Sequence, residues 1–126
     1  DAILDAELVV VCPSNPVVSI GTILNVTGVR TALQRTNAKV TGVSPIVAGA
    51  PIKGPADKLL TGLGFEVSAF GVANLYADFL DEFVIDVLDS DEKSRIETLG
   101  VNVKVTDTVM KSLDDKVRLA KFVLES

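Results

Sequence analysis

The sequence predicts an α/β fold, a three-layer Rossmann-like sandwich built on a mainly parallel sheet. Short apolar runs alternate with stretches of helical periodicity along all 126 residues, which is the pattern of successive β–α units. The apolar runs carry hydrophobic residues on both faces, as expected of parallel strands that are covered by helices. No repeat, linker or low-complexity segment interrupts the pattern, so residues 1–126 are expected to form part of a single domain.

Five short apolar runs are predicted to form the strands of this sheet. They are Leu8–Cys12, Val40–Val47, Phe65–Ala69, Phe83–Asp86 and Val101–Val105. Stretches with apolar residues at helical spacing lie between these strands and after the last one. They are Pro16–Asn25 and residues 27–37, 55–64, 72–79, 90–100 and 112–124, while residues 1–7 have the pattern of the tail of another helix.

Short polar residues and glycines set the expected helix ends. Thr27 and Ser90 are expected to cap two of the helices, and Ser112 with Asp115 forms a capping box for the last one. Gly64 is expected to end the helix that precedes it. The expected buried stripe of the last helix consists of Leu113, Val117, Ala120 and Leu124.

The composition indicates an acidic globular protein of ordinary domain size. Hydrophobic residues make up 48% of the chain, the mean hydropathy is +0.41 and the net charge is −5. The chain has no basic cluster and no Trp, so it lacks the usual features of a nucleic-acid-binding surface. No apolar run reaches the ~20 residues that a membrane span needs. We therefore expect neither a nucleic acid nor a membrane as a partner.

Residue types that are rare or absent narrow the possible chemistry. Histidine is absent, which excludes His-based triads and His metal sites. Cys12 is the one cysteine, so an internal disulfide is excluded and a reducing cytoplasm is the expected location. Without a histidine base, Cys12 is expected to be a small buried residue rather than a nucleophile.

The stretch CPSNPVVSIGTIL, residues 12–24, predicts a phosphate-binding turn between the first strand and its helix. Asn15 suits the N-cap position and Pro16 the first helical position, where its missing N–H costs nothing. Unpaired N–H groups and the positive end of the helix dipole favour a phosphate at such a turn. Ser14, Asn15 and Ser19 are the candidate ligands. The alternative is a plain β–α turn, because the stretch is not a P-loop and lacks G-x-G-x-x-G.

The second candidate is the loop SPIVAGAPIKGP, residues 44–55, which ends the second strand. Long loops at the carboxyl ends of the strands often hold ligands in α/β folds. Ser44, Lys53 and Asp57 are the candidate binding residues, and Lys53 could pair with a phosphate or a base carbonyl. Asp57 lies in a first helical turn, where the helix dipole alone favours a carboxylate, so a purely structural role stays open for it.

Two further polar clusters follow the fourth and fifth strands. Asp86, Asp89 and Asp91 could bind magnesium as neighbouring carboxylates. For Asp89 and Asp91 we prefer loop solubility and charge at a helix N-terminus, whereas both roles stay open for Asp86. Residues 106–108 form another short polar segment, which turn formation explains adequately.

Several of these stretches resemble one enzyme family, in one order over nearly the whole chain. The matching segments are CPSNPVVSIGTIL, VTGVRTAL, VSPIVAGAPIKGPADKLL, GVANLYADFLDEFVID and VTDTVMKSLDDKVRLAKFVL. They resemble the C-terminal part of the 2-phospho-L-lactate transferase family, which acts in the biosynthesis of coenzyme F-420. The resemblance implies that residues 1–126 are the C-terminal part of one nucleotide-binding α/β transferase domain whose N-terminal half is absent.

The resemblance also implies the reaction. A guanosine diphosphate-linked lactate, or the related enolpyruvyl or glyceryl compound, donates its organophosphate to the 5-deazariboflavin alcohol, with magnesium as cofactor, and GMP leaves. In that case the turn with Ser14 and Asn15 is expected to hold the phosphates of the donor. The loop around Lys53 is expected to lie on the nucleotide side of the crevice.

One departure from the family limits this expectation. The family opens with a glycine-rich β–α loop of the GGTGG kind, which these residues lack. The metal ligands and deazaflavin contacts expected in that half cannot be placed, so we expect these residues alone to be inactive. One alternative is a related family of bacterial cytoplasmic regulators that bind UDP-sugars without transferring anything. Another is an inactive but stable α/β segment, with an apolar patch or an oligomer contact, such as a homodimer, where the missing half packs.

Overall fold

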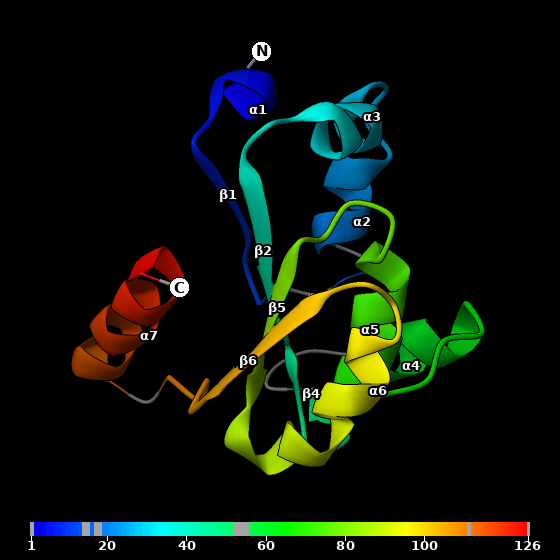
Figure 1. Ribbon diagram of the computed structural model, residues 1–126. Helices are drawn as coiled ribbons and strands as arrows, with labels where there is room; N and C mark the ends of the chain where they lie inside the picture. Colours follow the sequence, from blue (N-terminus) through cyan, green and yellow to red (C-terminus); the bar gives the residue numbers. More distant parts are fainter. Residues whose placement is uncertain (1, 14–15, 17–18, 52–55, 111, 126) are drawn as a thin grey trace.

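Four parallel strands form the main sheet of the protein (Figure 1). The structure, a computed structural model, describes residues 2–13, 16, 19–51, 56–110 and 112–125. The strands are β1 (Leu8–Val11), β2 (Lys39–Val43), β5 (Glu82–Asp86) and β6 (Asn102–Thr106), and they lie side by side in that order. The register pairs Thr41 with Val10 on one side and with Glu82 on the other. The prediction of an α/β fold with a parallel sheet is confirmed.

Helices and one small hairpin connect the strands. The helices are α1 (Ala2–Asp5), α2 (Ser19–Leu24), α3 (Val29–Arg35), α4 (Ala56–Gly62), α5 (Ala69–Tyr76), the 3₁₀ helix η1 (Val87–Glu92), α6 (Lys93–Glu97) and α7 (Leu113–Glu125). The hairpin consists of β3 (Ile46–Val47) and β4 (Ala50–Pro51), which pair antiparallel and form a second sheet of two strands.

The order of the strands explains where the helices lie. Each new strand joins the sheet on the same side of the preceding one. Because β–α–β crossovers are right-handed, crossovers that all step in one direction place their helices on one face of the sheet. Figure 1 shows this arrangement: α2 to α6 cover one face, while α7 packs against the other. We call these the crossover face and the α7 face.

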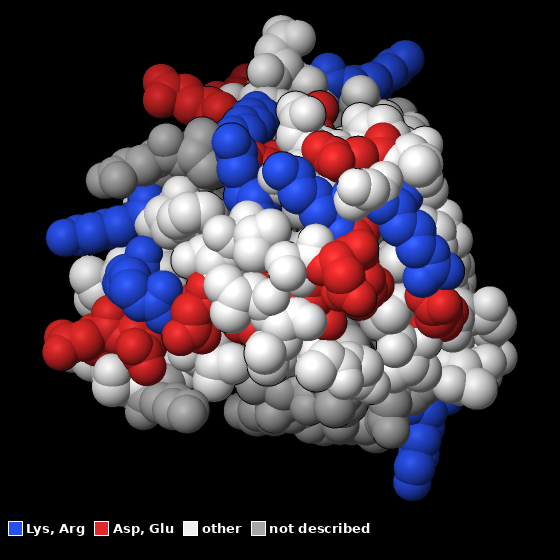
Figure 2. Space-filling model, turned by 60° about the horizontal axis from the view of Figure 1, so that its bottom comes forward, with Lys and Arg blue, Asp and Glu red and all other residues white. Residues whose placement is uncertain are grey.

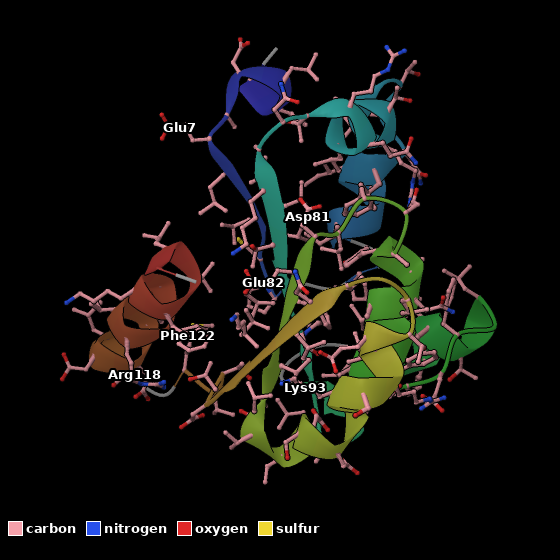
Figure 3. All side chains as sticks on the ribbon, in the orientation of Figure 1. Glu7, Asp81, Glu82, Lys93, Arg118 and Phe122 are labelled. Carbon is pink, nitrogen blue, oxygen red and sulfur yellow. The ribbon has the colours of Figure 1, made fainter. Side chains whose placement is uncertain are left out.

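Two cores of very different size result. On the crossover face, sheet residues including Val40, Phe83 and Ile85 pack against Val72, Tyr76 and Ile96 of the helices, all of them at most 1% exposed. On the α7 face, Val43 and Val84 pack against α7. Their buried partners there are Leu119 and Val123, with the partly buried Phe122 beside them (Figure 3).

The predicted strand Phe65–Ala69 is wrong. Ser68 instead caps α5, because its hydroxyl oxygen accepts a hydrogen bond from the backbone N–H of Gly71 at 3.0 Å. The N–H of Phe65 donates to the carbonyl of Leu60 at 2.9 Å, which ties this segment to the end of α4. Capping and helix termination therefore use the backbone groups that a strand would need.

The predicted strand Val40–Val47 is two elements rather than one. Strand β2 ends at Val43, and the chain turns at Ser44 before Ile46–Val47 enters the hairpin. The side chain of Ser44 makes this turn, since its hydroxyl bonds to the backbone of Ile46. A polar residue inside an apolar run marks the break.

Two predicted caps are also wrong. Gly28, in the left-handed region with φ 89°, occupies the N-cap of α3 in place of Thr27. Ser90 lies inside η1, whose N-cap is Asp86. The cap of α7 is confirmed, because the N–H of Asp115 donates to the hydroxyl of Ser112 at 3.2 Å.

The predicted stripe of the last helix is wrong in a way that bears on function. Leu113, Val117 and Leu124 are 74%, 45% and 66% exposed, and Ala120 is exposed as well. The buried residues are Leu119 and Val123, one turn apart. Helix α7 therefore carries apolar side chains both toward the sheet and away from it.

Candidate functional site

The carboxyl ends of the four parallel strands meet at one end of the sheet, where ligands bind in open α/β folds. This end lies at the bottom of Figure 1 and comes forward in Figure 2. Figure 2 shows acidic and basic side chains interspersed on this face. The four segments that leave the strands begin at Cys12, Ser44, Val87 and Asp107.

Most of the predicted ligands remain predictions. Ser14, Asn15 and Lys53 lie outside the described residues. Ser19 lies at the start of α2 and Asp57 in the first turn of α4, and the structure describes the backbone of both. Their positions place them after β1 and after the hairpin, on the two segments in which the sequence analysis predicts the nucleotide site.

Ser44 has a clear local role. It is fully buried, and its hydroxyl accepts from the N–H of Ile46 at 3.2 Å and donates to the carbonyl of Ile46 at 3.0 Å. Its own N–H donates to the carbonyl of Val84 at 2.9 Å. Ser44 therefore shapes the turn from β2 into the hairpin, and its contact with a ligand stays a prediction.

The hairpin tip is held by a buried carboxylate. Ala48 and Gly49 both have positive φ, 52° and 79°, as a two-residue hairpin turn of type I′ requires. Such a conformation is unfavourable for alanine. The carboxylate of Asp89, which is 3% exposed, accepts from the N–H of Ala48 at 3.0 and 3.2 Å. Asp89 thereby fixes the hairpin that leads into residues 52–55.

Asp86 is a structural link between two strand ends. One carboxylate oxygen accepts from the N–H of Leu88 at 3.0 Å. The other accepts from the N–H of Thr108 at 2.8 Å and from its hydroxyl at 3.1 Å. Asp86 therefore joins the segment after β5 to the segment after β6, and both Asp86 and Thr108 are buried.

Asp89, which is buried, and Glu92, which is half-buried, are neighbouring carboxylates on η1. Burial raises the pKa of both carboxyl groups above their ordinary values, and nearby carboxylates raise them further. Glu92 accepts from the N–H of Phe70 at 3.1 Å, at the start of α5. The pair therefore connects η1 to the hairpin through Ala48 and to α5 through Phe70.

These contacts bear on the proposed magnesium site. The part of the chain that the structure describes contains no group of three or more carboxylates or thiols arranged to hold a metal ion. Asp86 and Asp89 direct their oxygens to backbone N–H groups instead. The described residues therefore do not fit a magnesium site, and magnesium stays an expectation for the rest of the protein.

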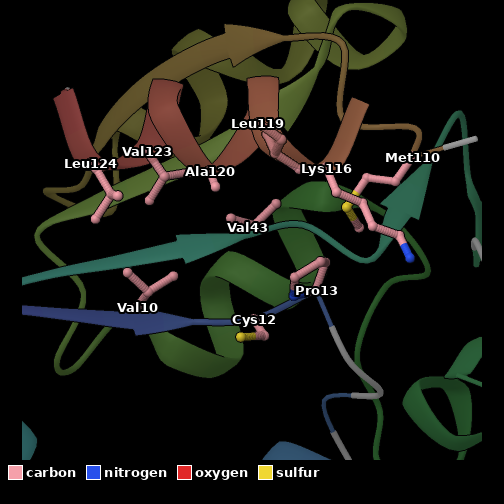
Figure 4. Close-up of a pocket in the computed structure, with 10 residues that line it drawn as sticks. All are labelled: Val10, Cys12, Pro13, Val43, Met110, Lys116, Leu119, Ala120, Val123 and Leu124. Atoms are coloured by element: carbon pink, nitrogen blue, oxygen red, sulfur yellow. The ribbon is translucent and has the colours of Figure 1, made fainter. Parts of the chain in front are cut away.

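The burial prediction for Cys12 is wrong. Its side chain is exposed. Cys12 follows β1 and is one of the residues that line a pocket between β1, β2 and α7 (Figure 4). The sequence analysis did not predict the bonds of Asp89 to Ala48 or of Thr108 to Asp86. The two residues of each bond are 41 and 22 residues apart in the chain, so no local pattern indicates them.

Comparison with known proteins defines the family. Residues 1–123 match the sequence model of the family described as 2-phospho-L-lactate transferase CofD. The chain is 48% identical over 124 residues to the 2-phospho-L-lactate transferase of Methanothermobacter thermautotrophicus, covering 98% of this chain and 40% of the relative. It is 43% identical to that of Methanocaldococcus jannaschii, covering 99% and 39%. It is 41% identical to the phosphoenolpyruvate transferase of Streptomyces coelicolor, covering 98% and 39%.

A solved structure supports the fold alone. An X-ray structure of a protein from Bacillus halodurans superposes with a TM-score of 0.62 at 16% sequence identity, over 98% of this chain and 44% of that one. The four-stranded parallel sheet with its flanking helices is consistent with a Rossmann-like fold.

The chain belongs to the 2-phospho-L-lactate transferase CofD family, whose named members are transferase enzymes. It spans about 40% of the length of the curated relatives that it matches. None of the helices in the described segments is long and apolar enough to cross a membrane.

Proposed function

We propose that the protein of which these residues form part transfers a three-carbon organophosphate in coenzyme F-420 biosynthesis. The donor is a lactate or enolpyruvate group linked through a diphosphate to guanosine. The acceptor is the deazaflavin alcohol, which takes the acid with one phosphate, and GMP leaves with the other in the cytoplasm. The observation that carries this proposal is the family match over residues 1–123. Relatives named 2-phospho-L-lactate transferase and phosphoenolpyruvate transferase support either three-carbon acid.

The carboxyl end of the sheet suits the nucleotide part of this reaction. In phosphoryl transfer the protein positions the attacking and leaving oxygens and neutralises the charge of the phosphates. The turn with Ser14 and Asn15 follows β1, and its helix N-terminus can receive the phosphates of the donor. Lys53, after the hairpin, can supply a positive charge to the same crevice.

The hairpin and its buried supports suit the task of positioning. Ser44 and Asp89 fix the two ends of the turn region from which residues 52–55 follow. A hairpin held in this way needs less ordering when a ligand binds near it, which favours affinity. The described residues thus contribute a rigid base for the site, and the ligand contacts are assigned to the two loops.

A product assay tests the proposal. The full-length polypeptide is incubated with magnesium, the deazaflavin alcohol and either the lactyl or the enolpyruvyl donor, and GMP and the phosphorylated deazaflavin are separated by chromatography. We expect the two products in equal amounts with one of the donors. Stoichiometric GMP without a deazaflavin product, or no turnover with either donor, contradicts the proposed transfer.

A further inference from the structure

The tip of the β3–β4 hairpin has a backbone conformation that its sequence does not favour. Ala48 has φ 52° and Gly49 has φ 79°. Glycine adopts positive φ about as readily as negative φ, whereas alanine is disfavoured there because of its Cβ atom. Ala48 is exposed, so packing of its side chain contributes little to this conformation. Another contact must hold the tip.

Asp89 supplies that contact. Its carboxylate oxygens accept from the N–H of Ala48 at 3.0 and 3.2 Å, although Asp89 is only 3% exposed. Burial and the neighbouring carboxylates disfavour the charged form of Asp89 and raise its pKa. Two unfavourable features, a positive φ at an alanine and a buried carboxylate, thus meet in one interaction. Strained groups of this kind persist where the surrounding structure fixes a position, and they gather at functional sites.

Asp89 is itself held on a firm base. The 3₁₀ helix η1 departs from helical geometry at Asp89, which has φ −107° and ψ 15°. Before it, Asp86 accepts from the N–H of Thr108 at 2.8 Å and so ties the start of η1 to the segment after β6. After it, Glu92 accepts from the N–H of Phe70 at 3.1 Å, at the start of α5. Through Asp89, the end of the main sheet and α5 therefore fix the conformation of the hairpin tip.

A pocket of about 500 Å³ opens beside this tip. The residues that line it are Gly49, Lys58, Thr61 and Val67. Gly49 belongs to the hairpin tip, next to Ala48, and Lys58 of α4 supplies a positive charge. The volume is in the range of ligand pockets, and the charge suits an anionic group. A change in the conformation of the tip would therefore alter a space that can receive part of an anionic ligand.

We propose that Asp89 is a positioning residue for the nucleotide donor, because it holds the hairpin tip beside this pocket through the N–H of Ala48. The inference rests on the proposed function, since a guanosine diphosphate-linked donor is the ligand. Binding beside a tip that is already fixed costs less ordering than binding beside a tip that the ligand must fix. Loss of the Asp89 carboxylate therefore weakens donor binding although no ligand contact is removed.

A glycine at position 48 separates this role from a general effect on stability. If Asp89 acts by keeping residue 48 at positive φ, glycine at that position makes the carboxylate dispensable, because glycine adopts positive φ without strain. Residue 48 is exposed, so water can take the place of the carboxylate at its N–H. A role in stability alone predicts no change in the affinity of the folded protein for the nucleotide.

The test is a calorimetric titration of the full-length polypeptide with GDP in the presence of magnesium. We expect Asp89→Ala to weaken GDP binding at least tenfold. Ala48→Gly alone is expected to keep the affinity within threefold of the native value. The combination of Asp89→Ala with Ala48→Gly is expected to return it to within threefold as well.

A second variant reaches the same tip without touching η1. Ala48→Val keeps the Asp89 carboxylate and adds a β-branched side chain at an exposed position, where positive φ is strongly unfavourable. We expect it to weaken GDP binding at least threefold. It decides the question where Asp89→Ala is too unstable for titration, because an exposed substitution leaves the apolar core intact.

Asp81→Ala is the matched control. Asp81 also accepts from a backbone N–H, that of Val40 at 2.8 Å, but it directly precedes β5 and lies at the amino end of the sheet. We expect this variant to lose stability and to keep the GDP affinity within twofold of the native value. Urea denaturation of every variant gives the folded fraction, so that the affinities refer to folded protein.

The native polypeptide separates the two possible failures. If it does not bind GDP, the proposed function fails and this inference fails with it. If it binds GDP, the proposed function stands, and any of three results overturns the inference alone. These are an unchanged affinity in Asp89→Ala or Ala48→Val, a loss in Asp89→Ala that Ala48→Gly does not restore, and an equal loss in Asp81→Ala.

Discussion

The two faces of the sheet differ in how completely they are built. Among the described residues, helices α2 to α6 cover the crossover face, which has a large apolar core with side chains such as Phe83 and Ile85 fully buried. In the part of the chain that the structure describes, the α7 face is covered by α7 and has a small core and an apolar groove. It also buries polar groups, since Glu82, at 1% exposure, forms an ion pair with Lys39 and accepts from Thr41.

This difference shows that strand order alone can produce an asymmetric domain. Every crossover is right-handed, so three crossovers that run in one direction along the sheet place their helices on one face. The other face is covered by α7, which follows β6 in the chain. Stability is therefore expected to depend mainly on the crossover face. The following variants compare the two faces.

The largest effect is expected where the crossover face is most tightly packed. A Cβ atom at Gly71 would lie 1.8 Å from the carbonyl oxygen of Glu66, which is backbone and cannot rotate away. We expect Gly71→Ala to lower the free energy of unfolding by about 4 kcal/mol, above the usual cost of overpacking. Urea denaturation measures it. Gly62→Ala is the control, because a Cβ there meets nothing within 4 Å, and a loss as large as that of Gly71→Ala would refute the steric explanation.

Two leucines, one on each face of the sheet, allow the stability contributions of the faces to be compared. Leu60 is fully buried on the crossover face, whereas Leu124 on α7 is 66% exposed. We expect Leu60→Ala to cost about 3 kcal/mol of unfolding free energy and Leu124→Ala less than about 0.5 kcal/mol in the chain alone. Thermal and urea denaturation of both variants measure the difference. Equal losses would show that the two faces contribute alike.

A smaller loss is expected from the buried link at the carboxyl end of the sheet. Asp86→Ala removes the acceptor for the N–H groups of Leu88 and Thr108 and for the Thr108 hydroxyl. Leaving such groups unsatisfied is expected to cost about 2 kcal/mol of stability. Asp107→Ala, which removes the acceptor of one exposed N–H at Val109, serves as the control. A loss of stability no larger than that of the control would contradict the structural role assigned to Asp86.

Ligand affinity provides the next comparison. In the full-length polypeptide, Asn15→Ala is expected to weaken binding of GDP at least tenfold, about 1.4 kcal/mol, because the proposed role of Asn15 is to contact a phosphate of the donor. Calorimetric titration measures the affinity. An unchanged affinity would contradict the phosphate contact proposed for Asn15.

The smallest effect concerns pH. Burial raises the pKa of Asp89 in the folded state, so the folded protein binds a proton more tightly than the unfolded chain does. Between the two pKa values the contribution of Asp89 to stability falls as the pH rises. Asp89→Asn removes this dependence and keeps an oxygen that can accept from Ala48. The stability of the variant relative to the native protein should therefore increase as the pH rises, and denaturation at several pH values tests it; a constant or decreasing difference would contradict the assignment.

The fold was largely predictable because its strands are apolar runs bounded by clear turn residues. The runs before Cys12, around Phe83 and after Gly100 are strands as predicted. Phe65–Ala69 has the same apolar character, but Ser68 caps a helix there, and this competes with strand formation. The stripe of α7 was missed for a different reason: apolar residues occur on both of its sides, and sequence spacing does not say which side meets the sheet.

The location of the candidate site and its ligand contacts both stay predictions, and the structure adds the contacts that shape the end of the sheet. Strand ends and helix starts indicate the carboxyl end of the sheet from the sequence alone. The long-range bonds of Asp86 and Asp89 are not visible in any local pattern, because they join segments that only the fold brings together.

The measurement that tests the central claim most directly is a calorimetric titration of the full-length polypeptide, with magnesium, against GDP and separately against UDP-N-acetylglucosamine. The account predicts saturable one-to-one binding of GDP and none of the UDP-sugar, with the GDP affinity reduced by Asn15→Ala. Binding of the UDP-sugar without GDP would contradict the proposed transferase and indicate a regulatory protein of the same fold.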